Sequence, residues 1–379
     1  MATLAGLFGV FAFGIIVALL GSIKLKLTPR IGADDAQFGK IVAVLQWTMV
    51  VMAIIGGIAI DNFGHRTILM AGAVLSAAAI LLIGSGKSVS AIMGACVLLG
   101  IGGQFVNLGG NTLIPRLFSD PSAGSNIGNT FFGLGAFLVP VITAALFQRM
   151  GFSKALTVLA VILAVGVMFP FLGAGQFPVV EAGFSIDLAI SLLSNVVTWL
   201  AALTLFCYIG LEVSMASWIT TYASELGADN ARASRILSVF FVAMMLGRLS
   251  VGLQDRVTGL DLTPIGGYVL AAAALVAFVA ITLMKNARTL GSATGAVALA
   301  GLAFAPIFPT TVGVTFKHFE PAQWGTLFGV IFAIGLVGAS TIPAWIGSMA
   351  KGKSVQAGLN ILRVTAILLA VIAFVLGRM

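Results

Sequence analysis

The chain has 379 residues, of which 60% are hydrophobic and only 8% are charged, whereas about a quarter of the residues in an ordinary soluble domain are charged. A soluble fold could not cover this much apolar surface, but a bilayer can, because a helix of about 20 residues spans its apolar core. The formal net charge of +8 comes from basic residues that stand singly or in pairs between apolar runs, which excludes the basic stripe of a nucleic-acid-binding protein.

Apolar runs separated by short polar or Gly/Pro-containing segments predict twelve transmembrane helices. The runs are too long and too evenly apolar to be barrel strands, which would alternate over about ten residues. The sequence therefore predicts an all-α membrane protein, with helices near residues 4–24, 37–60, 67–85, 89–113, 127–148, 154–175, 194–222, 233–254, 265–285, 291–315, 325–347 and 356–377.

The longest connection between apolar runs lies in the middle of the chain and separates six predicted helices from six others. This division predicts two halves that could move against each other. We expect an N-terminal six-helix half, a central connecting loop and a C-terminal six-helix half, at residues 1–175, 176–193 and 194–379.

A compact motif stands between the second and third predicted helices: Gly57, Asp61, Gly64, His65 and Arg66. Gly57 permits close contact between helices, Gly64 permits a tight turn, and Asp61 with Arg66 can form a charge cluster that holds one side of the protein shut. The Gly-x3-Asp-x2-Gly-basic-basic pattern resembles the signature of the major facilitator superfamily, although His65 stands where Arg or Lys is more usual. The resemblance implies a fold of two pseudo-symmetric six-helix halves with a substrate site between them.

The eighth predicted helix ends in a partial repeat of this motif, with Arg248, Asp255 and Arg256. We expect these three residues to act in gating together with the first motif, as the equivalent device of the second half. The two copies fit parallel halves that each contain inverted three-helix repeats.

The orientation that the resemblance implies places the motif loop and both termini in the cytoplasm, in a bacterial inner membrane. The distribution of basic residues disagrees, because more of them fall in the loops that this orientation places outside, and the positive-inside rule would invert the protein. We follow the motif, because its sequence is specific whereas the charge rule is statistical.

Glu212 is the single acidic residue in the middle of a predicted helix. A charged group at that depth costs about 2.5 to 3.5 kcal/mol on insertion scales and is by default a candidate functional residue. We predict that Glu212 binds a coupling ion, H+ or Na+. The alternatives are a neutral carboxyl group that donates a hydrogen bond to the substrate, or a structural partner for Arg248 or Arg363.

Polar and aromatic side chains on the same helices indicate the kind of substrate. Tyr208 lies one turn from Glu212 on one helix face, and the fourth predicted helix has an amide stripe at spacings of three and four. Amides, hydroxyls and aromatic rings suit a neutral polyol, although the amides could instead only join helices. The predicted substrate-binding residues are Gln46, Gln104, Asn107, Asn111, Tyr208, Glu212, Ser214 and Trp218.

Three segments resemble the fucose and glucose permease branch of the superfamily: Gly102 to Asn111, Tyr208 to Tyr222, and Gly301 to Thr310. This resemblance implies transport of a monosaccharide such as a hexose or fucose, often driven by protons or sodium. Asn107 departs from the pattern, because proton-coupled fucose permeases have an acid there. If this protein is coupled to protons, Glu212 must bind the proton; otherwise the protein is a facilitator.

The alternative within transport is an exporter of drugs or metabolites, since importers and exporters share the signature. An intramembrane enzyme is disfavoured, because His65 and His318 lie in predicted loops and no Ser/His dyad, acid pair or HExxH motif is present. Cys96 and Cys207 lie inside apolar runs, which argues against a disulfide framework or CxxC metal site. We expect a monomer without metal, cofactor or nucleic acid, whose partners are the bilayer, a sugar and a coupling ion.

Overall fold

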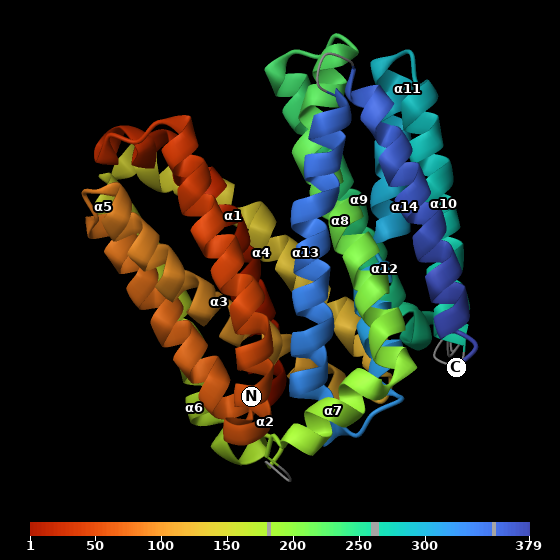
Figure 1. Cartoon of the computed structure of the whole chain (residues 1–379). Coiled ribbons are helices and arrows are strands. Elements are labelled where there is room, and N and C mark those ends of the chain that lie inside the picture. Colours follow the sequence, from red (N-terminus) through yellow and green to blue (C-terminus); the bar gives the residue numbers. More distant parts are fainter. Residues whose placement is uncertain (180–182, 259–264, 351–353) are drawn as a thin grey trace. The chain divides into compact units, whose positions relative to one another are not determined.

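The computed structural model describes residues 1–379 except 180–182, 259–264 and 351–353. All the regular elements in this described part are helices, shown in Figure 1. The α-helices are α1 (Ala2–Ile31), α2 (Asp35–Ser85), α3 (Val89–Arg116), α4 (Pro121–Arg149), α5 (Phe152–Ala164), α6 (Met168–Leu172), α7 (Ile186–Ser194), α8 (Val196–Glu225), α9 (Asn230–Thr258), α10 (Gly266–Asn286), α11 (Leu290–Phe304), α12 (Ile307–Phe316), α13 (Trp324–Ala350) and α14 (Val355–Leu376). Short 3-10 turns are η1 (Val165–Val167), η2 (Ala174–Gln176) and η4 (Pro321–Gln323).

Eleven helical stretches within the described ranges are long and apolar enough to cross a membrane. One of them, Ala36–Ser85, has 50 residues, enough for two crossings at about 20 residues each. Gly64 interrupts it with φ 76° and ψ 159°, a conformation that glycine adopts without strain. The chain is therefore a multi-pass integral membrane protein whose helices fit twelve crossings.

Polar side chains fix where several helices begin. Asp34 and Gln37 form a capping box at the start of α2, with Gln37 N–H donating to Asp34 Oδ1 at 2.7 Å. Ser88 and Asn195 accept hydrogen bonds from backbone N–H groups in the first turns of α3 and α8. These caps compensate the N–H groups that have no partner within the helix.

The structure departs from the predicted elements in several places. The predicted helix at 154–175 is divided into α5, η1 and α6. The predicted helices at 37–60 and 67–85 join into α2 with only the break at Gly64 between them. The predicted central loop at 176–193 contains most of α7, where Ser185 Oγ accepts from Leu188 N–H. The predicted helix at 291–315 is divided into α11 and α12 next to Pro306, because proline cannot donate a helical hydrogen bond.

Two compact units make up the chain. Unit 1 comprises Met1–Leu117, Phe131–Ala189 and Pro321–Val330. In it, α3 packs against α1 and α2, and α5 packs against α2. In the centre of α1, Ile15, Ile16 and Leu19 are completely buried. Unit 1 thus contains most of the first half of the chain and the start of α13.

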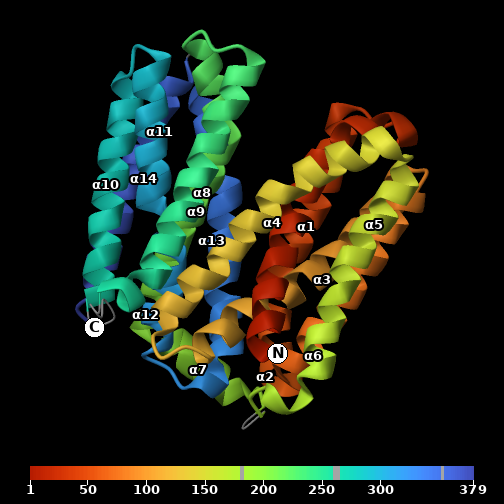
Figure 2. The same ribbon diagram turned by 180° about the vertical axis from the view of Figure 1, so that it is seen from behind.

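Unit 2 comprises Phe118–Thr130, Ile190–Glu320 and Ile331–Met379. Here α10 lies beside α11 and α14, as both views show (Figures 1 and 2), and α8 packs against α9, α12 and α14. Each unit therefore includes a short segment from the other half of the sequence. The division into halves at 1–175 and 194–379 stays a prediction.

Candidate functional site

Two charged side chains meet inside unit 2, where α9 packs against α8. Arg248 Nη2 donates to the Tyr208 hydroxyl at 2.9 Å and forms an ion pair with Glu212 Oε1 at 3.4 Å. Tyr208 and Glu212 lie one turn apart on α8 and therefore face the same neighbour. The sequence suggested Arg248 or Arg363 as a structural partner of Glu212. In the structure Glu212 pairs with Arg248.

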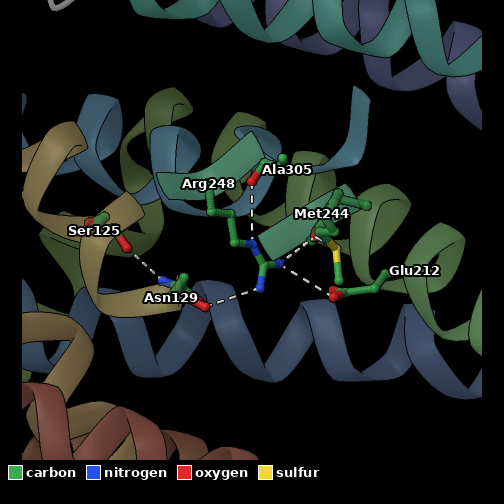
Figure 3. A network of polar contacts seen from close by, with 7 residues as sticks. Ser125, Asn129, Glu212, Met244, Arg248 and Ala305 are labelled. Atoms are coloured by element: carbon green, nitrogen blue, oxygen red, sulfur yellow. Dashed lines mark hydrogen bonds and ion pairs between the residues drawn. The ribbon is translucent and has the colours of Figure 1, made fainter. Parts of the chain in front are cut away.

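The rest of the Arg248 guanidinium binds backbone oxygens (Figure 3). Its Nε donates to the Ala305 carbonyl and its Nη1 to the Asn129 carbonyl, each at 3.4 Å. Ala305 lies in the break between α11 and α12. Because Pro309, four residues later, has no N–H, the Ala305 carbonyl lacks its usual helical donor, and Arg248 replaces it. Arg248 thus joins α8, α9, the α11–α12 break and the start of α4.

Burial differs within this cluster. Arg248 is 2% exposed, and Tyr208 is fully buried against Phe304 and Phe308. The side chain of Glu212 is 17% exposed. A buried ion pair compensates its desolvation only when further hydrogen bonds satisfy the charged groups. The two backbone carbonyls and the Tyr208 hydroxyl supply them for Arg248. Glu212 is the member of this cluster that a solute or an ion could reach.

Two further predicted site residues follow Glu212 on α8. Ser214 Oγ and Trp218 Nε1 are buried and have no hydrogen-bond partner among the described residues. An unsatisfied buried polar group costs about 1 to 3 kcal/mol, so a bound hydroxyl compound could stabilise both. Gln46 of α2 is an exposed side chain in unit 1.

The predicted amide stripe on α3 forms an internal chain of hydrogen bonds in unit 1. Asn111 Nδ2 donates to Asn107 Oδ1 at 2.8 Å, Asn107 Nδ2 to Gln104 Oε1 at 2.9 Å, and Gln104 Nε2 to the Met49 carbonyl of α2 at 2.7 Å. All three amide side chains are at most 4% exposed. One of these bonds, from Gln104 to the Met49 carbonyl, joins α3 to α2, as the alternative interpretation of this stripe expects. The assignment of the three amides to substrate binding stays a prediction.

A polar face at the start of α4 was not singled out from the sequence. Ser122 Oγ, Ser125 Oγ and Asn126 Oδ1 are buried without hydrogen-bond partners in the described part of unit 2. Asn126 Nδ2 donates to Thr310 Oγ1 of α12 at 3.3 Å, and Asn129 lies one turn further along the same face. In the sequence, Ser125, Asn126 and Asn129 follow Ser122 at spacings of three, four and seven residues, which predicts one helix face. This face was missed because it begins before the predicted helix at 127–148.

Asp61 lies in unit 1 against the N-terminus of α13. Its carboxylate accepts hydrogen bonds from the Gly325 N–H at 3.0 Å, the Thr326 N–H at 2.7 Å and the Thr326 hydroxyl. A carboxylate at this position satisfies N–H groups that the helix leaves unpaired and complements the helix dipole. Gly57 lies so close that an added Cβ would overlap the Gly325 carbonyl oxygen. Asp61 thus acts as an external cap on α13.

The other residues of the motif have separate partners. Arg66 donates to the Pro170 carbonyl of α6 at 3.2 Å. His65 is buried within α2, where its Nε2 lies 3.0 Å from Thr112 Oγ1, so the expectation of a loop position for His65 was wrong. The side chains of Asp255 and Arg256 lie outside the described residues. In the described ranges, no three His, Cys, Asp or Glu side chains gather as metal ligands.

Comparison with solved structures gives similar folds over nearly the whole chain. The fucose:proton symporter FucP of E. coli has a TM-score of 0.78 and 19% identity, covering 100% of this chain and 97% of FucP. The human organic anion transporter MFSD10 has a TM-score of 0.75 and 17% identity, covering 98% of this chain and 97% of MFSD10. At these identities the likeness concerns the fold alone.

Comparison of sequences gives a relative and a family. Protein TsgA of Salmonella typhimurium is 28% identical over 195 residues, which are 48% of this chain and 47% of TsgA. The chain thus matches about half the length of that relative. The sequence profile of the Major Facilitator Superfamily matches residues 3–343, from α1 into α13. The chain belongs to the Major Facilitator Superfamily.

Proposed function

We propose that this chain is a secondary transporter that moves a monosaccharide of the hexose or fucose type across the bacterial inner membrane by alternating access. Membership in the superfamily supports the transport part of the proposal. The sugar part is supported by the similar fold of a fucose:proton symporter and by the polar side chains of α8. The protein works as a monomer with both termini in the cytoplasm.

The observation that carries the proposal is the set of polar side chains on α8. Glu212 offers carboxylate oxygens as acceptors, and Ser214 and Trp218 offer buried donors that have no partner among the described residues. A sugar presents adjacent hydroxyls, each able to donate and accept, and an apolar C–H face that can stack on an indole ring. Among the predicted site residues, these side chains of α8 offer such groups, whereas the amides of α3 are already bonded to one another.

Glu212 is also the proposed site of ion coupling, and its carboxylate forms an ion pair with Arg248. A proton bound to Glu212 would remove the negative charge that faces Arg248 and weaken their ion pair. The guanidinium would keep its bonds to Tyr208 and to two backbone carbonyls. Protonation would therefore release the carboxyl group without releasing Arg248 from its helices.

The contact of Asp61 with α13 supplies the gate of this mechanism. It ties α2 to a segment that comes from the second half of the sequence, Pro321–Val330. Opening that side of the protein would require these hydrogen bonds to break. Asp61 therefore takes the gating role, and Gly57 permits the close approach.

Uptake of labelled hexoses and fucose into proteoliposomes, with and without an imposed proton gradient, tests the proposal. The variants are Glu212→Gln and, as a control, Glu320→Gln, whose side chain is exposed outside the spanning helices. Saturable gradient-driven accumulation that is lost only in Glu212→Gln, with gradient-free exchange retained, would support a symporter with Glu212 as the proton site. Equilibration indifferent to the gradient would indicate a facilitator. Failure to move any sugar would overturn the sugar assignment in favour of a drug or metabolite exporter.

A further inference from the structure

Two cations share one neutral acceptor where α10 and α14 pack together in unit 2. Lys285 Nζ donates to Asn360 Oδ1 at 2.8 Å, and Arg363 Nη1 donates to the same oxygen at 3.3 Å. Arg363 Nε also donates to Thr282 Oγ1 at 3.0 Å, and its guanidinium lies 5.2 Å from the centroid of the Phe278 ring. All of these partners are electrically neutral.

The positive charge of this group is not balanced by an acid in the described structure. None of the ion pairs between described residues includes Lys285 or Arg363. Glu225 also reaches the start of α14, but both its oxygens accept from the Val355 N–H, at 2.8 and 3.0 Å. Two like charges that converge on one amide oxygen repel each other, so an additional anion would be favourable here.

The seam between the two helices is open to the surroundings of the protein. Lys285, Asn360 and Arg363 are each partly exposed rather than buried. The same helices also expose large apolar side chains: Val279 and Leu283 on α10, and Val364, Ile367 and Leu368 on α14. Lys285 lies in the last turn of α10, near the end of a membrane-spanning segment, where lipid headgroups are found.

We propose that the seam of Lys285, Asn360 and Arg363 is a binding site for the phosphate headgroup of an anionic phospholipid. Phosphate oxygens accept charge-assisted hydrogen bonds from ammonium and guanidinium groups, so two cations that share one neutral acceptor suit the phosphate of a headgroup. The acyl chains lie along the exposed apolar side chains of α10 and α14. A free phosphate ion has the same headgroup chemistry but gains nothing from that apolar surface. The site lies on α10 and α14, involves none of the α8 side chains proposed for the solute, and does not depend on the transported solute.

Native mass spectrometry of the full chain in detergent tests the site, with phosphatidylglycerol compared with phosphatidylcholine of the same acyl chains. Three variants are compared with the native chain. Asn360→Asp keeps both cations and places a carboxylate between them. The double variant Lys285→Gln with Arg363→Gln removes both charges. Arg149→Gln removes an exposed cation from the last turn of α4 in the other unit, as a control. Thermal unfolding with each lipid, and with inorganic phosphate alone, is measured in parallel.

The native chain and Arg149→Gln should retain phosphatidylglycerol over phosphatidylcholine and unfold at a higher temperature when it is present. Asn360→Asp should bind phosphatidylglycerol about fivefold more weakly and should remain folded, since its carboxylate forms ion pairs with both cations. The double variant should lose about fivefold for each cation removed. Equal binding of the two lipids, unchanged preference in Asn360→Asp, or protection by inorganic phosphate equal to that by phosphatidylglycerol would each overturn the assignment.

Discussion

Arg248 donates hydrogen bonds to Tyr208 and to two backbone carbonyls besides pairing with Glu212. Removing one partner of a buried pair typically costs about 3 to 5 kcal/mol, because the remaining charge is left without compensation. We expect Arg248→Met to lie in that range, since it also leaves the Ala305 carbonyl without a donor. Glu212→Gln also removes the counter-ion of the buried Arg248, but it should cost less, about 1.5 to 3 kcal/mol, because the Gln oxygen can still accept from Arg248 and the guanidinium keeps its other three bonds.

Thermal unfolding in a fixed detergent measures both effects, and the double variant shows whether the residues act as a pair. Arg248→Met combined with Glu212→Gln should lose less stability than the sum of the single variants, by about 0.5 to 3 kcal/mol. Additive losses, or a smaller loss in Arg248→Met than in Glu212→Gln, would contradict the role given to Arg248.

Ser122 is a residue whose replacement should stabilise the protein, in contrast to Arg248. Its buried hydroxyl has no hydrogen-bond partner in the described part of the chain. Removing an unsatisfied buried hydroxyl also removes its desolvation penalty, so Ser122→Ala should stabilise the protein by about 1 kcal/mol. Ser153→Ala is the matched control, because the Ser153 hydroxyl donates to the Gly84 carbonyl at 2.6 Å, and its loss should destabilise by a similar amount. Destabilisation by Ser122→Ala would show that its hydroxyl is bonded in the membrane.

The sequence allowed part of this site to be predicted. Glu212 was singled out because a charge inside a spanning helix is expensive, and Arg248 was one of the partners considered. The spacing of the amides showed that they share a helix face, but spacing does not tell whether they bond to a solute or to each other. The position of Pro309 four residues after Ala305 was a readable signal for a backbone oxygen in need of a donor. The identity of that donor depends on how helices pack, which no local pattern encodes.

At the scale of elements, Asp61 caps a helix that lies far away in the sequence. Asp61→Ala removes three acceptor contacts from the start of α13. Loss of a helix cap costs about 0.5 to 2 kcal/mol, and we expect hydrogen exchange at the amides of Gly325 and Thr326 to accelerate accordingly. Asp61→Asn should have a smaller effect, because its side-chain oxygen can still accept.

Glu320→Gln provides the comparison for Asp61, because Glu320 lies just before α13 and its side chain is exposed. It should leave exchange in the first turn of α13 unchanged. Equal acceleration in Asp61→Ala and Glu320→Gln would mean that general charge near the helix start, and not the direct hydrogen bonds of Asp61, protects these amides.

Most helices could be predicted because an apolar run of about 20 residues has few other solutions in lipid. The errors lie where a single residue changes the backbone. At Gly64 the backbone leaves the helical conformation, but α2 is helical on both sides of it. Pro306 divides one predicted helix into α11 and α12. Helix α7 was missed because its nine residues are too few to span a membrane and lie in a segment that composition marks as a connection.

At the scale of the whole molecule, each compact unit contains a segment from the other half of the sequence: Phe118–Thr130 in unit 2 and Pro321–Val330 in unit 1. These are the starts of α4 and α13, the same positions where the unpartnered oxygens and the Asp61 cap lie. The long central connection predicted two halves. It could not show that each compact unit includes a segment from the other half, because apolar patterns do not tell which helix a given face meets. If the predicted sequence halves are the bodies that move in the proposed alternating access, both segments must change their contacts.

The orientation of the molecule in the membrane is open to a direct test, because the motif and the distribution of basic residues predict opposite results. An even number of crossings places both termini on the same side. With the termini inside, the connection between α2 and α3 lies outside and the connection between α3 and α4 lies inside. Lys87 and Ser119 are exposed residues in these two connections, whereas the native Cys96 and Cys207 are buried and should contribute little labelling.

We expect Lys87→Cys to react with a membrane-impermeant maleimide in intact cells and Ser119→Cys to react only after the cells are permeabilised. The reverse pattern would show that the positive-inside rule prevails over the motif. The Asp61 contact would then close the outer side of the protein. The proton gradient in the uptake experiment would have to be imposed in the opposite direction relative to the reconstituted protein. Labelling of both positions in intact cells would contradict the assignment of α3 as a single crossing.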